Sequence, residues 1–431
     1  MPRIGVGIGL GQFGVGGSAL DADALAYINA LSADGYPLEA PEQTYINTLV
    51  TDFKSAGIWS KMKAIYPYCT SQRNLIGYTN NWTNAIWQGS SVTTGQTDPF
   101  GGTNAVLCSV EKWQSFSYTT LTQYTVSIYA KANTATSFTL GSDSVTNYYS
   151  TFNLSTQTVT NSTGYVGTIT SIGNGWYRCQ VTWTKDSGGA VTQPFYDVKP
   201  ISGSMYYYGP QLELGSTATT YQPVATTAST IFASQFKYNL KDPRNLDAAF
   251  RQVFNGGWTY SKQGATPNGT NGYADTKLNS LTTLSQNSTH IGLYSRTNSS
   301  AGFYDMGNRT GPVNLLDLAI RYGGSTYGGV FSTESLFVDA NSLGHYISNR
   351  ISSTTQKVFK NGNVGVTGTA SSNTPPNLNV YIGSYNFDGT ATSFSSRQYA
   401  FASMGDGLTD SEASAMYTAV QQFNTSLNRQ V

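Results

Sequence analysis

The chain has 431 residues, only 11% of them charged, and carries a net charge of +1 at neutral pH. This length exceeds what one hydrophobic core normally supports, so two or three domains are expected. A charge this close to zero provides no electrostatic footprint for nucleic acid or anionic lipid, and we expect neither as a partner. The 45 glycines and 30 tyrosines, among abundant Ser, Thr and Asn, indicate a protein rich in β-structure.

The cysteines and the hydropathy pattern exclude several further classes. Cys69, Cys108 and Cys179 are too few and too widely spaced for a disulfide framework or a zinc site. Cys108 and Cys179 lie in alternating apolar runs, which predicts buried thiols. No run approaches the roughly 20 apolar residues of a membrane span, and we expect no secretory signal. We also expect no metal and no cofactor.

The N-terminal residues 1–20 form a glycine-rich arm. Glycine alternates there with Ile4, Val6, Ile8 and Leu10, so one face is aliphatic and the other is bare. Four aliphatic side chains cannot form a core, and alternate glycines give a free arm high backbone entropy. The pattern predicts an extended arm that adds to the sheet of a partner.

Residues 21–69 change to a helical period and are expected to form a short helical anchor segment. Asp21 or Asp23 can cap a first helix, which ends near Gly35. Pro41 and Glu42 begin a second helix, and residues 58–62 are predicted as a third, short one. The apolar stripes of these helices require a surface to pack against.

Residues 70–224 alternate with the two-residue period of strands throughout. Residues 124–131 and 176–183 are predicted strands, and Gly173-Asn174-Gly175 before the second is a hairpin signal. In the closing run, Tyr206 and Tyr208 share one face of a strand. Eight to ten short strands of this kind predict a β-sandwich or jelly roll.

Four stretches of this region carry a resemblance to a known family. They are Asn74-Leu75 with Trp82 and Trp87, the strand at 124–131, Trp176-Tyr177-Arg178, and the exit from Gly209-Pro210-Gln211-Leu212-Glu213 to Tyr221-Gln222-Pro223. Together they resemble the carbohydrate-binding-module-like jelly rolls of bacteriophage tail and head fibre proteins. The segment that follows, 216–230, has no apolar period and is interpreted as a linker.

Residues 225–431 resemble a second family. The stretches at 239–250, 256–259 and 264–276 are similar to the laminin-G/concanavalin A-like lectin sandwich carried by many phage structural proteins. A helix should begin at Thr409, where Glu412 three residues later completes a capping box. In such proteins a short helical segment usually precedes the lectin sandwich directly. The resemblance therefore implies that the jelly roll of 70–224 is inserted into one helix-plus-lectin domain.

The expected fold class is mainly β: two antiparallel sandwiches with a short N-terminal helical segment and a C-terminal helix. The resemblance implies a bacteriophage virion protein, a fibre or decoration component that is made in the host cytoplasm and exposed on the particle. Its expected partners are other virion proteins, bound through the arm, and cell-surface or environmental glycans. A homo-oligomer is expected, a trimer being one form. The alternatives are an assembly or cementing protein without glycan binding and a polysaccharide depolymerase.

Aromatic side chains are the expected glycan-binding groups, because sugar rings stack on Trp and Tyr while amides bond their hydroxyls. The candidates are Trp82, Trp87, Trp113, Tyr207, Trp258 and Tyr260. Each has a second interpretation, because a Trp in a β-sandwich usually belongs to the core. Trp82 is the preferred candidate, since Asn80 and Asn81 beside it suggest a position outside the buried alternation.

Catalytic residues are not expected. The two histidines, His290 and His345, lack companions at a diagnostic spacing, and a structural or exposed role is expected for both. The acids Asp305, Asp317, Asp339 and Asp388 stand singly, whereas a glycosidase needs two carboxylates in proximity. Acids far apart in the sequence can still converge in the fold.

Overall fold

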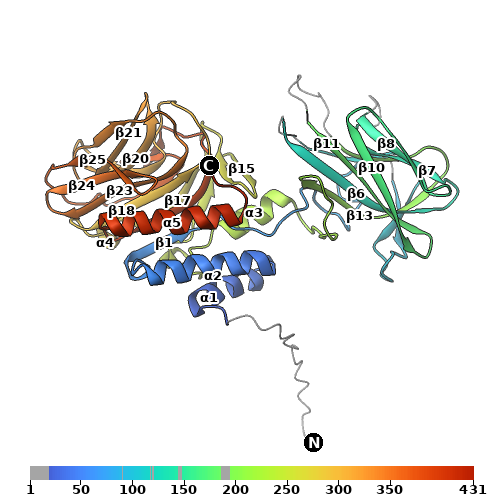
Figure 1. The fold of residues 1–431 in the computed structure, drawn as a ribbon, viewed down its shortest axis with the longest axis horizontal. Coiled ribbons are helices and arrows are strands. Elements are labelled where there is room, and N and C mark those ends of the chain that lie inside the picture. The colour runs from blue at the N-terminus through green and yellow to red at the C-terminus, as the bar shows by residue number, and fades with distance from the viewer. Residues whose placement is uncertain (1–18, 90, 117, 119–120, 144–147, 186–194) are drawn as a thin grey trace, which may run out of the picture. The chain divides into compact units, whose positions relative to one another are not determined.

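The computed structural model describes residues 19–89, 91–116, 118, 121–143, 148–185 and 195–431. The chain divides into two compact units. The first unit comprises the residues up to 67 with 238–258 and 266–431, and the second comprises 68–237 with 259–265. Each unit contains a β-sandwich (Figure 1), and the described strands pair antiparallel except for one parallel pair, β19 with β27. The predicted fold class is confirmed.

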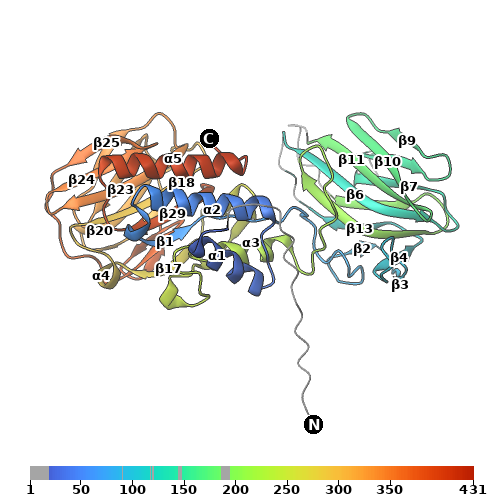
Figure 2. The ribbon, with the colours of Figure 1, turned by 60° about the horizontal axis from the view of Figure 1, so that its bottom comes forward.

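The helices of the first unit begin where the sequence predicts. Helix α1 (Ala22–Ala33) is capped by the Asp21 side chain, and α2 (Ala40–Ser55) has proline in its first turn. Helix α5 (Asp410–Ser426) begins with the predicted capping box. Helices α2 and α5 lie side by side (Figures 1 and 2).

The third predicted helix is wrong. Residues Trp59–Lys61 make only a single 3-10 turn, and Met62–Tyr66 form strand β1. The strand is favoured because its register against β29 places Ile65 opposite Ser403 and Tyr66 opposite Ala402. The pairing of β1 with the distant strand β29 has therefore outweighed the helical pattern of the local sequence.

The strands of the first unit form two large sheets. The first sheet has the order β15 (Trp258–Ser261), β16 (Gly264–Pro267), β29 (Tyr399–Gly405), β18 (Thr289–Ser295), β23 (Gly344–Ser352), β24 (Thr355–Lys360), β25 (Asn363–Gly368), with β1 also on β29. The strand order of this sheet thus begins with β15 and β16, most of whose residues fall in the segment 259–265. The second has the order β14 (Val253–Asn255), β17 (Tyr273–Asn279), β26 (Asn379–Ile382), β19 (Met306–Thr310), β20 (Asn314–Tyr322), β21 (Ser325–Val330), β22 (Ser335–Val338), with β27 (Tyr385–Phe387) and β28 (Thr390–Thr392) attached. Short elements, η2 (Asp247–Ala249) and α4 (Ser280–Thr283), connect these strands. Strands β1 and β29, which are far apart in the sequence, are thus neighbours in one sheet.

The second unit is a sandwich of two six-stranded sheets. One sheet, which we call the front sheet, has the order β10 (Tyr165–Gly173), β11 (Trp176–Thr184), β6 (Gln123–Ala132), β13 (Met205–Leu214), β4 (Ala105–Cys108), β3 (Thr93–Gln96). The other, the back sheet, has the order β2 (Gln88–Gly89), β5 (Lys112–Ser115), β12 (Phe195–Pro200), β7 (Ser137–Asp143), β8 (Tyr148–Asn153), β9 (Thr158–Asn161). Cys108 and Cys179 lie fully buried and unpaired between the sheets, as predicted.

A helix that the sequence does not predict closes the second unit. Residues Ala228–Phe236 form α3, capped by the Thr227 side chain, where part of a linker was expected. Phe236 packs against Tyr68 with ring centroids 5.3 Å apart, and Thr70 Oγ1 donates a hydrogen bond of 2.5 Å to Gln235. The two ends of the segment 68–237 therefore lie beside each other.

Candidate functional site

One face of the front sheet points into the sandwich core, and the other face points away from it. Strands β11, β6 and β13 are neighbours, and their register aligns Arg178, Tyr129 and Tyr208 in one row. Next to them along the three strands, Ile128, Cys179 and Tyr207 are fully buried in the sandwich core. Because side chains alternate across a strand, the row lies on the face turned away from that core.

The outer face carries a group of rings that we call the outer aromatic cluster. Its members are Phe100, Tyr129, Trp176, Tyr206, Tyr208 and Tyr221. The Phe100 ring stands edge-on to Tyr129 and Tyr208 at centroid distances of 5.4 and 6.0 Å. Tyr129 and Tyr208 are 5.8 Å apart. Phe100 is 67% exposed, whereas Tyr129 is only 8% exposed, so the cluster presents one open ring above a packed base.

The turn at residues 98–104 holds Phe100 in its exposed position. Asp98 Oδ1 accepts hydrogen bonds from the backbone N–H groups of Phe100 at 2.9 Å and Gly102 at 3.0 Å, and Oδ2 accepts one from Asn104. Gly101 has φ of +89°, a backbone conformation that favours glycine. A buried carboxylate therefore orders the turn that presents the ring.

Arg178 lies at the edge of the cluster. Its guanidinium group stacks over the Tyr129 ring at 4.4 Å. Nη2 donates hydrogen bonds to Ser127 Oγ at 2.7 Å and to the Thr219 carbonyl at 3.2 Å. These contacts fix a planar cation against the aromatic face.

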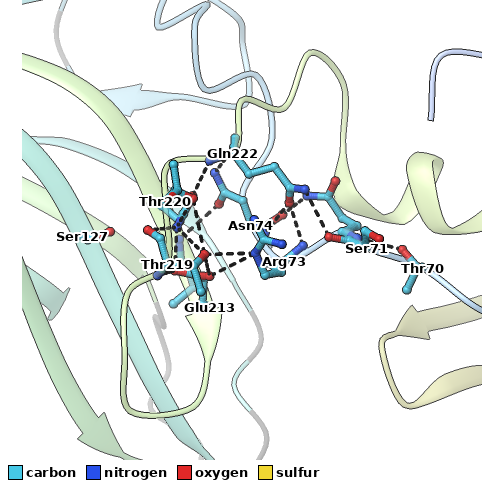
Figure 3. A network of polar contacts seen from close by, with 12 residues as sticks. Thr70, Ser71, Arg73, Asn74, Ser127, Glu213, Thr219, Thr220 and Gln222 are labelled. Atoms are coloured by element: carbon cyan, nitrogen blue, oxygen red, sulfur yellow. Dashed lines mark hydrogen bonds and ion pairs between the residues drawn. The ribbon is translucent and has the colours of Figure 1, made fainter. Parts of the chain in front are cut away.

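Four buried or half-buried polar side chains form a network that we call the polar clasp (Figure 3): Asn74, Gln211, Glu213 and Gln222. Asn74 Nδ2 donates to the carbonyls of Pro210 and Gln222 at 3.0 Å each, and its Oδ1 accepts from the Leu212 N–H at 3.1 Å. The clasp joins the segment leading into the sandwich to the strand that leaves it.

The rest of the clasp accounts for the exit motif noted in the sequence. Gln211 Oε1 accepts from the Gln222 N–H at 2.7 Å, and Glu213 accepts from Gln211 Nε2 at 2.6 Å. Gly209 forms part of a bulge at φ of +62°, where a Cβ atom would lie 3.0 Å from the Tyr129 ring. The exit motif therefore has a structural role, because its hydrogen bonds hold the end of strand β13 in position.

Three of the six candidate residues are corrected by the structure. Trp82 is 1% exposed, Trp87 4% and Tyr207 0%, and all three belong to the sandwich core. Trp82 and Trp87 stack on each other at 4.5 Å, so the prediction that Trp82 lies outside the buried alternation is wrong. Burial leaves these rings no face on which a sugar could stack.

The other three candidates are half-buried and lie apart from the outer aromatic cluster. Trp113 is on β5 of the back sheet. Trp258 Nε1 donates to the Asn255 carbonyl at 3.0 Å. Tyr260 packs edge-on to Phe236 at 6.1 Å, and burial raises the pKa of its hydroxyl. A contribution of these rings to binding stays a prediction.

The two histidines are buried in the first unit. Burial lowers the pKa of His290 to about 4 and that of His345 to about 3. His290 Nδ1 lies 2.7 Å from the Asp406 carbonyl, while neither ring nitrogen of His345 has a hydrogen-bond partner among the described residues. Both are therefore neutral parts of the core.

Two acids that are distant in the sequence converge in the same unit. Asp317 is fully buried, and Tyr385 donates to its Oδ2 at 3.2 Å. Glu334 accepts from Tyr304 at 2.9 Å, and the Tyr304 and Tyr385 rings stack at 4.4 Å. Burial, with the charge and hydrogen bond of Glu334, raises the pKa of Asp317 well above its ordinary value. The Asp317 carboxyl group therefore keeps its proton to a higher pH than an exposed carboxyl group does.

The Asp317→Asn substitution is expected to change the stability of the protein at alkaline pH. Because the folded pKa of Asp317 exceeds its unfolded value of 3.8, stability is full below that value and falls as pH rises towards the folded pKa. Asp317→Asn keeps the shape of the buried side chain without titrating, so the variant should gain roughly 1–2 kcal/mol of stability on the wild type at alkaline pH. Urea unfolding across pH measures this, and a gain independent of pH would contradict it.

Neither a metal site nor a membrane-spanning helix is found among the described residues. Among the described residues, no three His, Cys, Asp or Glu side chains gather as metal ligands would. Within the same part of the chain, no helix combines the length and apolarity needed to cross a bilayer.

The fold and its outer face define a two-sandwich β-protein with an aromatic sheet surface. No protein-family profile and no curated protein sequence matches the chain. Among solved structures, the mouse laminin alpha1 chain, domains LG4-5, is 11% identical with a TM-score of 0.25, covering 78% of this chain and 91% of that one. The tripod from the baseplate of bacteriophage Tuc2009 is 13% identical with a TM-score of 0.22, covering 77% and 91%. TM-scores this low carry no argument about function.

Proposed function

We propose that this protein binds glycans through the outer face of the front sheet. The observation that carries the proposal is the outer aromatic cluster, in which Phe100 is 67% exposed over Tyr129 and Tyr208. Sugars present apolar faces that stack on such rings, and the neighbouring half-buried Gln180 offers a hydrogen-bonding amide on the same face. Stacking on one ring supplies only about 1 kcal/mol beyond area burial, so a single site should bind weakly.

We place this activity on a bacteriophage virion, in a fibre or decoration component. The support is the low charge with a surface of hydroxyls and amides, and the resemblance of both sandwiches to phage modules. Attachment to other virion proteins is assigned to the arm at 1–20, of which 1–18 lie outside the described residues. A homo-oligomer, such as a trimer, would multiply weak sites into useful avidity.

The test of glycan binding is Phe100→Ala. Because the ring is largely exposed, its removal should leave the unfolding temperature almost unchanged while weakening glycan binding about tenfold. Binding to a glycan array, followed by titration with the strongest ligand, measures the effect. Phe387→Ala is the matched control, since Phe387 is also exposed, at 42%, but lies in the first unit.

The same experiment separates the alternatives. A cementing protein without glycan binding would show no array signal in either the wild type or Phe100→Ala. A depolymerase would shorten the bound polysaccharide, with Asp317 and Glu334 as its candidate carboxylates. Asp317 is 0% exposed, which argues against its contact with a substrate.

A further inference from the structure

The front and back sheets differ in the charges that their strands carry. Across the six strands of the front sheet, Lys131 and Arg178 are the cations and Glu213 is the one carboxylate. The strands of the back sheet carry two lysines and two aspartates, so their charges balance. The strands of the front sheet therefore carry one positive charge more than negative charges, whereas those of the back sheet carry none in excess.

The single carboxylate of the front sheet is engaged within the polar clasp. Glu213 is 3% exposed, and its oxygens accept hydrogen bonds from Thr219 Oγ1 and Gln211 Nε2 at 2.6 Å each. Arg73 Nε lies 3.9 Å from it. Asp98, near the cluster, is 5% exposed and accepts three backbone hydrogen bonds. Neither acid forms an ion pair with Lys131 or Arg178.

The two cations lie among the aromatic rings. The register places Lys131 between Trp176 and Tyr206, in the row next to that of Arg178. Among the described residues, the Lys131 ammonium group makes no hydrogen bond and no ion pair. In the same part of the chain, Arg178 uses Nη2 alone, which leaves Nε and Nη1 as donors. Two half-buried cations with unused donors thus flank rings on which a sugar can stack.

We propose that the ligand of this face is an anionic polysaccharide whose carboxylate or phosphate groups pair with Lys131 and Arg178 while its rings stack on the outer aromatic cluster. This inference rests on the proposed glycan binding and names the class of glycan. Charge complementarity selects this occupant: a neutral glycan would leave both cations unpaired, whereas an anion supplies charge-assisted acceptors for them. The extra hydrogen bonds also add to the weak stacking energy.

The experiment uses the full chain on an array of neutral polysaccharides (dextran, pullulan) and acidic ones (polygalacturonate, alginate, hyaluronate), with oligothymidylate as a nucleic-acid probe. The expected result is binding to acidic members that weakens with salt, and about tenfold weaker binding when their carboxyl groups are methyl-esterified. Lys131→Gln should lose about tenfold on the acidic ligand, while Lys131→Arg should retain binding. Lys199→Gln, an exposed lysine of the back sheet, is the matched control and should bind as the wild type does.

The outcomes distinguish the two proposals. Binding to neutral members alone, or equal binding to the esterified and free acids, would overturn the anionic ligand and leave glycan binding standing. No binding to any polysaccharide would overturn both. Tighter binding to oligothymidylate than to every acidic glycan would replace the glycan by a single-stranded nucleic acid, which basic groups among aromatic rings can also accept.

Discussion

Acidification from pH 6.5 to about pH 4 is expected to destabilise the protein by roughly 5 kcal/mol through His290 and His345. Their pKa values are lowered in the folded state from 6.5 to about 4 and about 3, so the unfolded chain takes up protons first as pH falls. Each pKa unit corresponds to about 1.4 kcal/mol. The loss is comparable to the whole stability of many domains, so unfolding near pH 4 is expected. Circular dichroism and urea titration across this range measure it.

His345→Phe isolates the histidine effect from other acid-sensitive groups. Phenylalanine keeps the ring contacts with Tyr294 and Phe401, whose centroids lie 6.5 and 6.0 Å away, and removes two buried nitrogens. The variant should match or exceed the wild type at neutral pH and lose roughly half as much stability on acidification. Since the Asp317–Glu334 pair acts in the opposite direction in both proteins, its effect cancels. A variant whose pH dependence equals that of the wild type would refute the assignment.

Asn74→Ala is expected to destabilise the second unit by roughly 3 kcal/mol. The substitution leaves the buried Leu212 N–H and the carbonyls of Pro210 and Gln222 without their Asn74 partner. Asn74→Asp should cost at least as much, because a carboxylate oxygen would face those two carbonyl oxygens. Hydrogen exchange of the Leu212 amide, with urea unfolding, measures the effect.

The control for the polar clasp is Asn133→Ala. Asn133 is exposed and donates to Ser204 Oγ at 2.8 Å, so its removal should cost well under 1 kcal/mol. Equal losses for Asn74→Ala and Asn133→Ala would show that the clasp adds no stability to the unit.

The sequence predicted those features whose signals are local. The capping box of Thr409 and Glu412, the Gly173–Gly175 hairpin and the free buried thiols required only near neighbours in the chain, and each is confirmed. The prediction that Trp82 is exposed was wrong because its asparagine neighbours indicate only a turn. Its burial results from stacking on Trp87 within the core.

The outer aromatic cluster was missed for a related reason. The two-residue period shows that Tyr206 and Tyr208 share a face, but it does not say which face is buried. Only the register of β13 and β11 on β6 brings Tyr208 and Arg178 to Tyr129. Likewise, Asp317 and Glu334 meet because of the tertiary fold, and no local pattern reports the raised pKa of Asp317.

The pairing of β1 with β29 sets an order of events during synthesis on the ribosome. Tyr66 is synthesised well before its partner strand, which begins at Tyr399. At about 5–20 residues per second, β1 waits roughly 20–70 s for that partner. The second unit is complete before then, since all of its residues precede Tyr399 in the chain. We therefore expect the sandwich of the second unit to fold first on the nascent chain, while the apolar faces of α1 and α2 remain exposed to chaperones until the later strands of the first unit are synthesised.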